Sequence, residues 1–135
     1  MKICICCSLT FTKEVLALAD KLKELGHELL MPNGVVNRLI EQPDFDPVKA
    51  KTTTNAVRNH IDKVRKADAI LVCNYDKKGI AGYIGANTFI EIAAAYYHHK
   101  PIFALNPLPD QPYINDEIQS FDIKVLNGDL SRLKK

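Results

Sequence analysis

The sequence predicts a single α/β domain over residues 1–135, a Rossmann-like or flavodoxin-like three-layer sandwich with a parallel sheet of about five strands. Short apolar runs alternate with amphipathic helical segments, the order expected when helices cover both faces of a parallel sheet. The length of 135 residues suits one domain. A composition of 47% hydrophobic and 25% charged residues is that of an ordinary globular chain.

The first half of the chain is predicted to hold two strands. Lys2 to Ser8 is a short apolar run typical of a buried strand. Thr12 to Leu25 carries apolar residues at the spacing of an amphipathic helix. His27 to Met31 predicts a second strand. The stretch from Val35 to Thr54 has two prolines and little periodicity, so we expect a long loop with one short helix at Val35 to Glu41.

The second half repeats the alternation of helix and strand. Helices are predicted at Asn55 to Lys66, Thr88 to His98 and Asn115 to Gln119, and strands at Asp68 to Asn74, Ile102 to Leu105 and Ile123 to Leu126. The strands of residues 3–7, 29–31, 68–74 and 102–105 are expected to form the central block of the sheet. Ligands of such sheets bind beyond the carboxyl ends of the strands. We therefore expect a site built from the loops at residues 8–11, 74–87 and 106–113.

Charge and apolar content limit the classes of partner. The formal net charge is only +2 and the basic residues are scattered, so neither a nucleic acid polymer nor a membrane surface is the expected partner. No stretch approaches the ~20 apolar residues of a membrane span, and the amino terminus lacks the features of a signal peptide, which predicts a cytoplasmic protein. The four cysteines lie inside apolar runs without metal-ligand spacing. They are expected to be reduced, buried and unliganded: Cys4, Cys6, Cys7 and Cys73.

Glu91 is the leading candidate for chemistry, because it follows a glycine-bearing loop at a predicted helix start. A helix N-terminus offers free N–H groups and a partial positive charge, which we expect to keep this carboxylate ionised at neutral pH. The spacing Thr88-x-x-Glu91 also fits a capping box, in which Glu91 only bonds back to the backbone of Thr88. The residues alone leave both interpretations open.

Four segments together resemble the nucleoside 2-deoxyribosyltransferase-like superfamily, which includes the 2′-deoxynucleoside 5′-monophosphate N-hydrolases. They are the strand Ala67 to Asn74, the glycine loop after it, the helix start Thr88 to Ala95, and Lys100-Pro101-Ile102. The resemblance implies cleavage or transfer of the N-glycosidic bond of a nucleoside, a nucleotide or a related N-riboside, with Glu91 as nucleophile. It also implies a homodimer or homotetramer. No cofactor and no metal are expected.

Other candidate residues carry two interpretations each. His60 stands where the family often has an acid, and is either a proton donor or sugar ligand, or a partly exposed helix histidine. Ser8 and Thr10 either hold a phosphate or 5′-hydroxyl, or cap the next helix. Asn74 and Asn87 either bind sugar hydroxyls or serve local turns. The remaining candidates for substrate binding are Gly85, which stands where the transferases have a second acid, and Thr88.

Three other functions fit the same residues. Asn87 to Glu91 echoes the G-T-x-x-E signature of phosphoribohydrolases of the lonely-guy type, although the proline and paired glycines before it are missing. The altered helper positions also suit a non-catalytic nucleotide-binding module on the same fold. A small interaction domain is a further alternative. Convergence of Glu91, His60 and Asn87 on one cleft would favour an enzyme.

Overall fold

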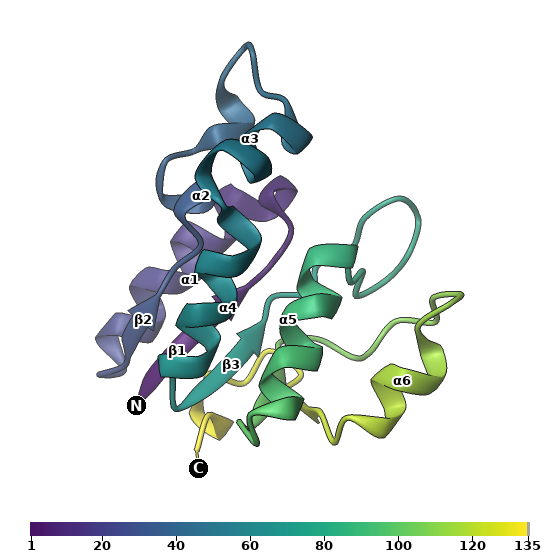
Figure 1. Ribbon diagram of the computed structural model, residues 1–135. Helices are drawn as coiled ribbons and strands as arrows, with labels where there is room; N and C mark the ends of the chain where they lie inside the picture. Colours follow the sequence, from purple (N-terminus) through teal and green to yellow (C-terminus); the bar gives the residue numbers. More distant parts are fainter. Residues whose placement is uncertain (135) are drawn as a thin grey trace.

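The computed structural model, which describes residues 1–134, is an α/β sandwich built on a five-stranded parallel sheet (Figure 1). The strands are β1 (Lys2–Cys6), β2 (Glu28–Leu30), β3 (Ala69–Val72), β4 (Ile102–Ala104) and β5 (Lys124–Val125). Their order is β2-β1-β3-β4-β5, and every neighbouring pair is parallel. The predicted fold class is confirmed. The strand of residues 29–31 was expected in the central block of the sheet. This expectation is wrong, because β2 forms an edge of the sheet.

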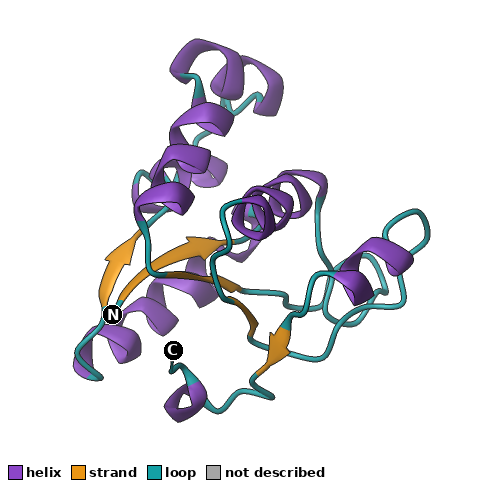
Figure 2. Ribbon diagram, turned by 60° about the horizontal axis from the view of Figure 1, so that its bottom comes forward, coloured by secondary structure: helices purple, strands orange, loops and turns teal. Residues whose placement is uncertain are grey.

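The helices connect successive strands across the two faces of the sheet. They are α1 (Thr12–Glu24), α2 (Asn33–Val36), α3 (Pro47–Thr54), α4 (Ala56–Lys66), α5 (Ala86–Tyr97) and α6 (Asn115–Ser120), with 3-10 turns η1 (Leu9–Phe11), η2 (Leu39–Glu41) and η3 (Leu130–Arg132). Helix α1 lies against one face, and α4 and α5 lie side by side against the other (Figures 1 and 2). No helix within residues 1–134 is long and apolar enough to cross a membrane.

The alternation of side chains along β1 divides the core into two layers. Ile3 and Ile5 pack in the cluster that contains the buried face of α1. Cys4 and Cys6 point to the opposite face, into the cluster formed with α4 and α5. All four cysteines are buried free thiols, so their predicted place in the core is confirmed. The two faces of this strand therefore present different chemistry, aliphatic toward α1 and thiol toward α4 and α5.

The predicted long loop of residues 35–54 is wrong in its second part, where α3 forms. The side chain of Asp46 accepts hydrogen bonds from the N–H groups of Val48 and Lys49, and Pro47 occupies the first helical position. None of the residues of α3 is buried. Its sequence has no apolar stripe that could pack on the core. Hydrophobic periodicity therefore could not predict this helix.

Candidate active site

The structure brings Glu91 and His60 together although they lie on different helices. The Oε2 atom of Glu91 is 3.2 Å from Nε2 of His60, and the two residues are only 8% and 7% exposed. Helix α4 carries His60 and helix α5 carries Glu91. The alternative that His60 is a partly exposed helix histidine is therefore wrong. An imidazole and a carboxylate in contact form a pair that can hold and transfer a proton.

A backbone hydrogen bond that is missing beside β1 leaves a carbonyl free to hold the ring of His60. The N–H of Glu28 donates to the carbonyl of Met1, and this ladder continues two residues at a time along the parallel strands β1 and β2. The third rung would need an N–H at residue 32 for the carbonyl of Ile5, but Pro32 has none. Nε2 of His60 lies 2.8 Å from that carbonyl and satisfies it instead.

Glu91 reaches His60 because α5 begins earlier than predicted. Gly85 is the N-cap and Ala86 the first helical residue, so Glu91 lies in the second turn of the helix. Thr88, expected as the cap, is a buried helical residue. The capping-box interpretation is therefore wrong, and the carboxylate of Glu91 faces α4 rather than the backbone at Thr88.

The pKa values of both residues are shifted upward from their usual values. Burial raises the pKa of Glu91 to about 7, although the charge of His60 opposes this rise. The expected ionisation through the helix dipole is thus wrong in direction, because desolvation outweighs the dipole. Burial lowers the pKa of His60, but the Cys4 thiol, the Glu91 carboxylate and the Ile5 carbonyl raise it more. Glu91 therefore changes charge near neutral pH, and its protonation state depends on that of His60.

Two thiols of β1 complete the surroundings of His60. The Sγ atoms of Cys4 and Cys6 lie 3.5 Å and 3.9 Å from Nε2. Hydrogen bonding from Cys6, opposed by burial and aided by His60, lowers the pKa of Cys4 to about 6. The pKa of Cys6 is raised by its hydrogen bond with Cys4 and by burial. The cluster is a buried set of groups whose protonation states depend on one another.

The same three residues are spaced closely enough to hold a metal ion. The donor atoms of Cys4, Cys6 and His60 lie within 4.8 Å of one another. The Nε2 atom, however, is at hydrogen-bonding distance from the Ile5 carbonyl, which assigns its proton to that nitrogen. A metal-bound imidazole nitrogen must be deprotonated. The donor set therefore fits a hydrogen-bonded cluster better than a metal site.

Ser8 and Thr10 follow β1 as predicted, and Lys77 joins them from the loop after β3. The Ser8 hydroxyl caps the short turn η1 by accepting from the N–H of Thr10, so the capping interpretation applies to Ser8. Nζ of Lys77 donates to Thr10 Oγ1 at 2.7 Å and to Ser8 Oγ at 3.2 Å. Sequence reasoning missed Lys77. The signal available to it was a basic residue in a loop that leaves the carboxyl end of a strand.

Asn74 is 1% exposed and fully engaged in joining two loops. Its amide nitrogen donates to the carbonyls of Asn106 and Pro107, and its oxygen accepts from the N–H of Asn106. The amide nitrogen also reaches the carbonyl of Gly82, a residue with a positive φ of 66°. The side chain of Asn74 thus holds the exits of β3 and β4 together. This role is structural, but it joins two loops that are 32 residues apart rather than serving a local turn.

The other predicted binding residues lie at the start of α5. Asn87 precedes Glu91 by four residues and therefore lies on the same side of the helix, one turn nearer its start. Thr88 is 3% exposed, and Gly85 is the extended N-cap residue. Of the predicted convergence, contact is present between Glu91 and His60, and Asn87 lines the same side of α5.

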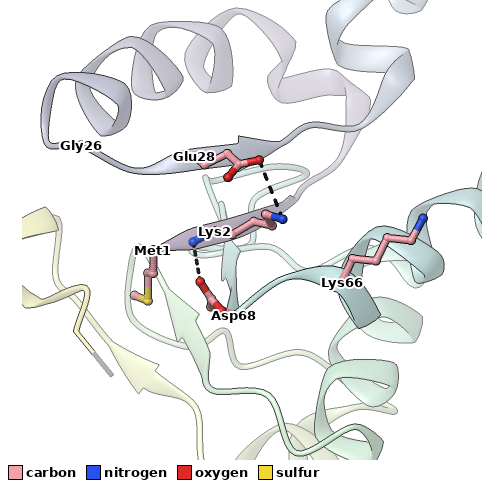
Figure 3. A pocket seen from close by; sticks show the side chains of 6 residues that line it. All are labelled: Met1, Lys2, Gly26, Glu28, Lys66 and Asp68. Atoms are coloured by element: carbon pink, nitrogen blue, oxygen red, sulfur yellow. Dashed lines mark hydrogen bonds and ion pairs between the residues drawn. The ribbon is translucent and has the colours of Figure 1, made fainter.

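Two surface hollows lie elsewhere. One, of about 390 Å³, is at the amino end of β1 and β2, where Lys2 and Glu28 form an ion pair of 3.9 Å and the N–H of Lys2 donates to Asp68 (Figure 3). The other, of about 520 Å³, is lined by the end of α5 and by Phe121. The first lies at the amino ends of the strands, away from the loops predicted to carry the site, and Glu91 lines neither hollow.

Solved structures share this fold. A 2-deoxyribosyltransferase of Bacillus psychrosaccharolyticus matches with a TM-score of 0.53 and 22% identity, over 80% of this chain and 74% of that chain. The CMP N-glycosidase BcmB of Clostridium botulinum matches with a TM-score of 0.51 and 16% identity, over 93% of this chain and 87% of that chain. No protein-family model matches the chain, and no curated protein matches it. At these identities the likeness confirms the resemblance at the level of the fold.

Proposed function

We propose that the protein cleaves or transfers the N-glycosidic bond of a nucleoside, a nucleotide or a related N-riboside, with Glu91 as nucleophile. The observation that carries the proposal is the buried contact of 3.2 Å between Glu91 and His60 on neighbouring helices. The shared fold supports it, because one protein of this fold is a deoxyribosyltransferase and another is a CMP N-glycosidase. Fold alone does not define activity, so the site must carry the argument.

The proposed reaction has two steps. The ionised carboxylate of Glu91 attacks the anomeric carbon of the sugar, the bond from that carbon to the base nitrogen breaks, and its electron pair leaves with the base, which takes up a proton. Water, or a second base, then attacks the same carbon. This releases the carboxylate and leaves the sugar with net retention of configuration, as in retaining glycosidases.

His60 would act in this reaction in two ways. Its positive charge lowers the pKa of Glu91 against the effect of burial and so increases the fraction of carboxylate that can attack. Its contact with the Ile5 carbonyl holds the ring in place, which aligns the carboxylate. His60 is thus proposed as a positioning residue for the nucleophile.

We also propose that two copies of the chain associate through the end of α5. Tyr96 and Tyr97 are 52% and 78% exposed, and they line the 520 Å³ hollow together with Phe121. Adjacent exposed aromatic side chains beside a hollow are typical of protein interfaces. A second copy is the proposed occupant, because the same helix carries Glu91 and an interface there would hold that helix in place.

The proposed function is tested by incubating the protein with a panel of nucleosides, nucleoside monophosphates and NAD, and by measuring free base by chromatography. Release of base from at least one member supports the proposal. Binding of a nucleotide without release of base would instead identify a nucleotide-binding module on this fold. Release of base and ribose 5-phosphate from ribonucleoside 5′-monophosphates alone would favour the phosphoribohydrolase alternative.

A further inference from the structure

We propose that Ser8, Thr10 and Lys77 form a binding site for an oxyanion of the substrate, a phosphate or a carboxylate. The inference rests on the proposed function and adds the class of substrate to it. It starts from the environment of the Lys77 amine. Within residues 1–134 this amine contacts two hydroxyls and the face of Tyr83, whose ring centroid is 5.3 Å away, and it takes part in no ion pair.

The amine is held in place before any ligand arrives. Lys77 and Ile80 exchange two backbone hydrogen bonds of 3.1 Å and 2.9 Å around a tight turn with positive φ at Lys78 and Gly79. Asp76 accepts from the N–H of Gly82, and the N–H of Tyr83 donates to the carbonyl of Tyr75. This network keeps the loop folded. Lys77 is thereby presented to the loop after β1 at low entropic cost.

A partly desolvated cation without a carboxylate partner attracts an anion. Burial, together with the charge of Lys78, lowers the pKa of Lys77. An oxyanion would reverse that penalty by forming a charge-assisted hydrogen bond with the amine. The two hydroxyls can rotate to donate to the same anion, because a hydroxyl is both a donor and an acceptor. Ammonium and hydroxyls together are a donor set suited to phosphate or carboxylate oxygens.

The location suits a substrate of Glu91. Ser8 follows Ile5 by three residues, and the Ile5 carbonyl contacts His60. Three residues of chain span at most about 11 Å. Ser8 and the His60 contact of Glu91 therefore both lie near the carboxyl end of β1, and parallel sheets bind ligands at the carboxyl ends of their strands. The substrate class that we propose to contact both Glu91 and Lys77 is one with an anionic group on its sugar or on its base.

The test compares pairs of ligands that differ in one anionic group, a nucleoside with its 5′-monophosphate and nicotinamide riboside with nicotinic acid riboside. Binding is measured by calorimetry and cleavage by kcat/KM. We expect Lys77→Met to weaken binding of the member that carries the phosphate or carboxylate in one pair by about 10- to 100-fold, and to leave binding of the member without that group unchanged. The pair that responds identifies the source of the oxyanion. Lys77→Arg should retain most of the preference, and Lys49→Met, on the exposed helix α3, should retain all of it.

A purely structural role for Lys77 predicts a different result. Lys77→Met would then lower the melting temperature and weaken both members of each pair equally, and this outcome would overturn the proposal. Equal affinity of the unaltered protein for all members of both pairs would overturn it as well. Because the calorimetric comparison needs no turnover, the oxyanion site can fail or succeed independently of catalysis by Glu91.

Discussion

The carboxylate of Glu91 and the imidazole of His60 are 3.2 Å apart, on two helices that lie side by side over the same face of the sheet. Burial of both residues makes the ionised form of each depend on the other. The cost of removing two charges from water offsets most of the attraction within a buried ion pair. A carboxylate that served only to stabilise the fold would therefore gain little from this position. A nucleophile with a cationic neighbour gains a defined orientation and a pKa near the working pH.

The first prediction concerns the pH dependence of base release. Glu91 attacks only as the carboxylate, and its pKa is about 7. We expect kcat/KM to rise about tenfold per pH unit below pH 7 and then to level off. The measurement is kcat/KM from pH 5 to 9 on any substrate that the panel identifies. A rate independent of pH between 5 and 7 would contradict the assignment of Glu91.

Replacing His60 tests the coupling between the two residues. His60→Gln keeps a donor for the Ile5 carbonyl but removes the positive charge that lowers the pKa of Glu91. The rising limb of the pH profile should therefore move to higher pH, and kcat at pH 7 should fall by about tenfold or more. His98→Gln, a change at the far end of α5, serves as the control. An unshifted pH profile in the His60 variant would show that His60 does not control the pKa of Glu91.

Removing the charge of Glu91 should stabilise the folded protein at high pH. The folded-state pKa of Glu91 is raised from 4.5 to about 7, so the stability that its protonated form contributes is lost as the pH rises through that range. Glu91→Gln lacks this loss and should gain up to ~3 kcal/mol in free energy of unfolding above pH 7. Urea unfolding of both proteins at pH 5 and 8 measures it. If the difference in free energy of unfolding between the two proteins decreased with rising pH, burial of the ionised carboxylate would be contradicted.

Introducing a charge at the end of α5 tests the proposed association of two copies through this helix. Tyr97→Asp would bring two buried charges into the proposed interface, which should convert a dimer to monomers in sedimentation at micromolar concentration. Tyr113→Asp alters a fully exposed tyrosine on another segment and should leave the dimer intact. Monomeric behaviour of the unaltered protein, or a dimer that survives Tyr97→Asp, would remove α5 as the interface.

The fold was predictable because its determinants are local. The apolar run of β3, AILV, and the stripe of Val15, Leu18 and Leu22 in α1 are each contained within one element. The contact of His60 with the Ile5 carbonyl was not predictable in the same way. It depends on Pro32 interrupting the ladder beside β1, a relationship among three segments that no single-element pattern contains.

The start of α5 shows how one local error affects the site. Thr88 and Glu91 match a capping box, but Gly85 caps the helix and shifts Glu91 into the second turn. The change replaces a partly solvated position by a buried one, which is why the pKa of Glu91 is raised rather than lowered. Lys77 was missed for a related reason. Its neighbours Ser8 and Thr10 lie 69 and 67 residues away in the sequence.

The most direct test of Glu91 as nucleophile is the rate of base release by Glu91→Gln, with Glu117→Gln on exposed helix α6 as the matched control. Glutamine keeps the size of the side chain and removes the attacking oxygen. We predict a loss of several orders of magnitude in kcat for Glu91→Gln without loss of folded structure, and an unchanged rate for Glu117→Gln. Base release by Glu91→Gln at the rate of the unaltered protein would contradict it.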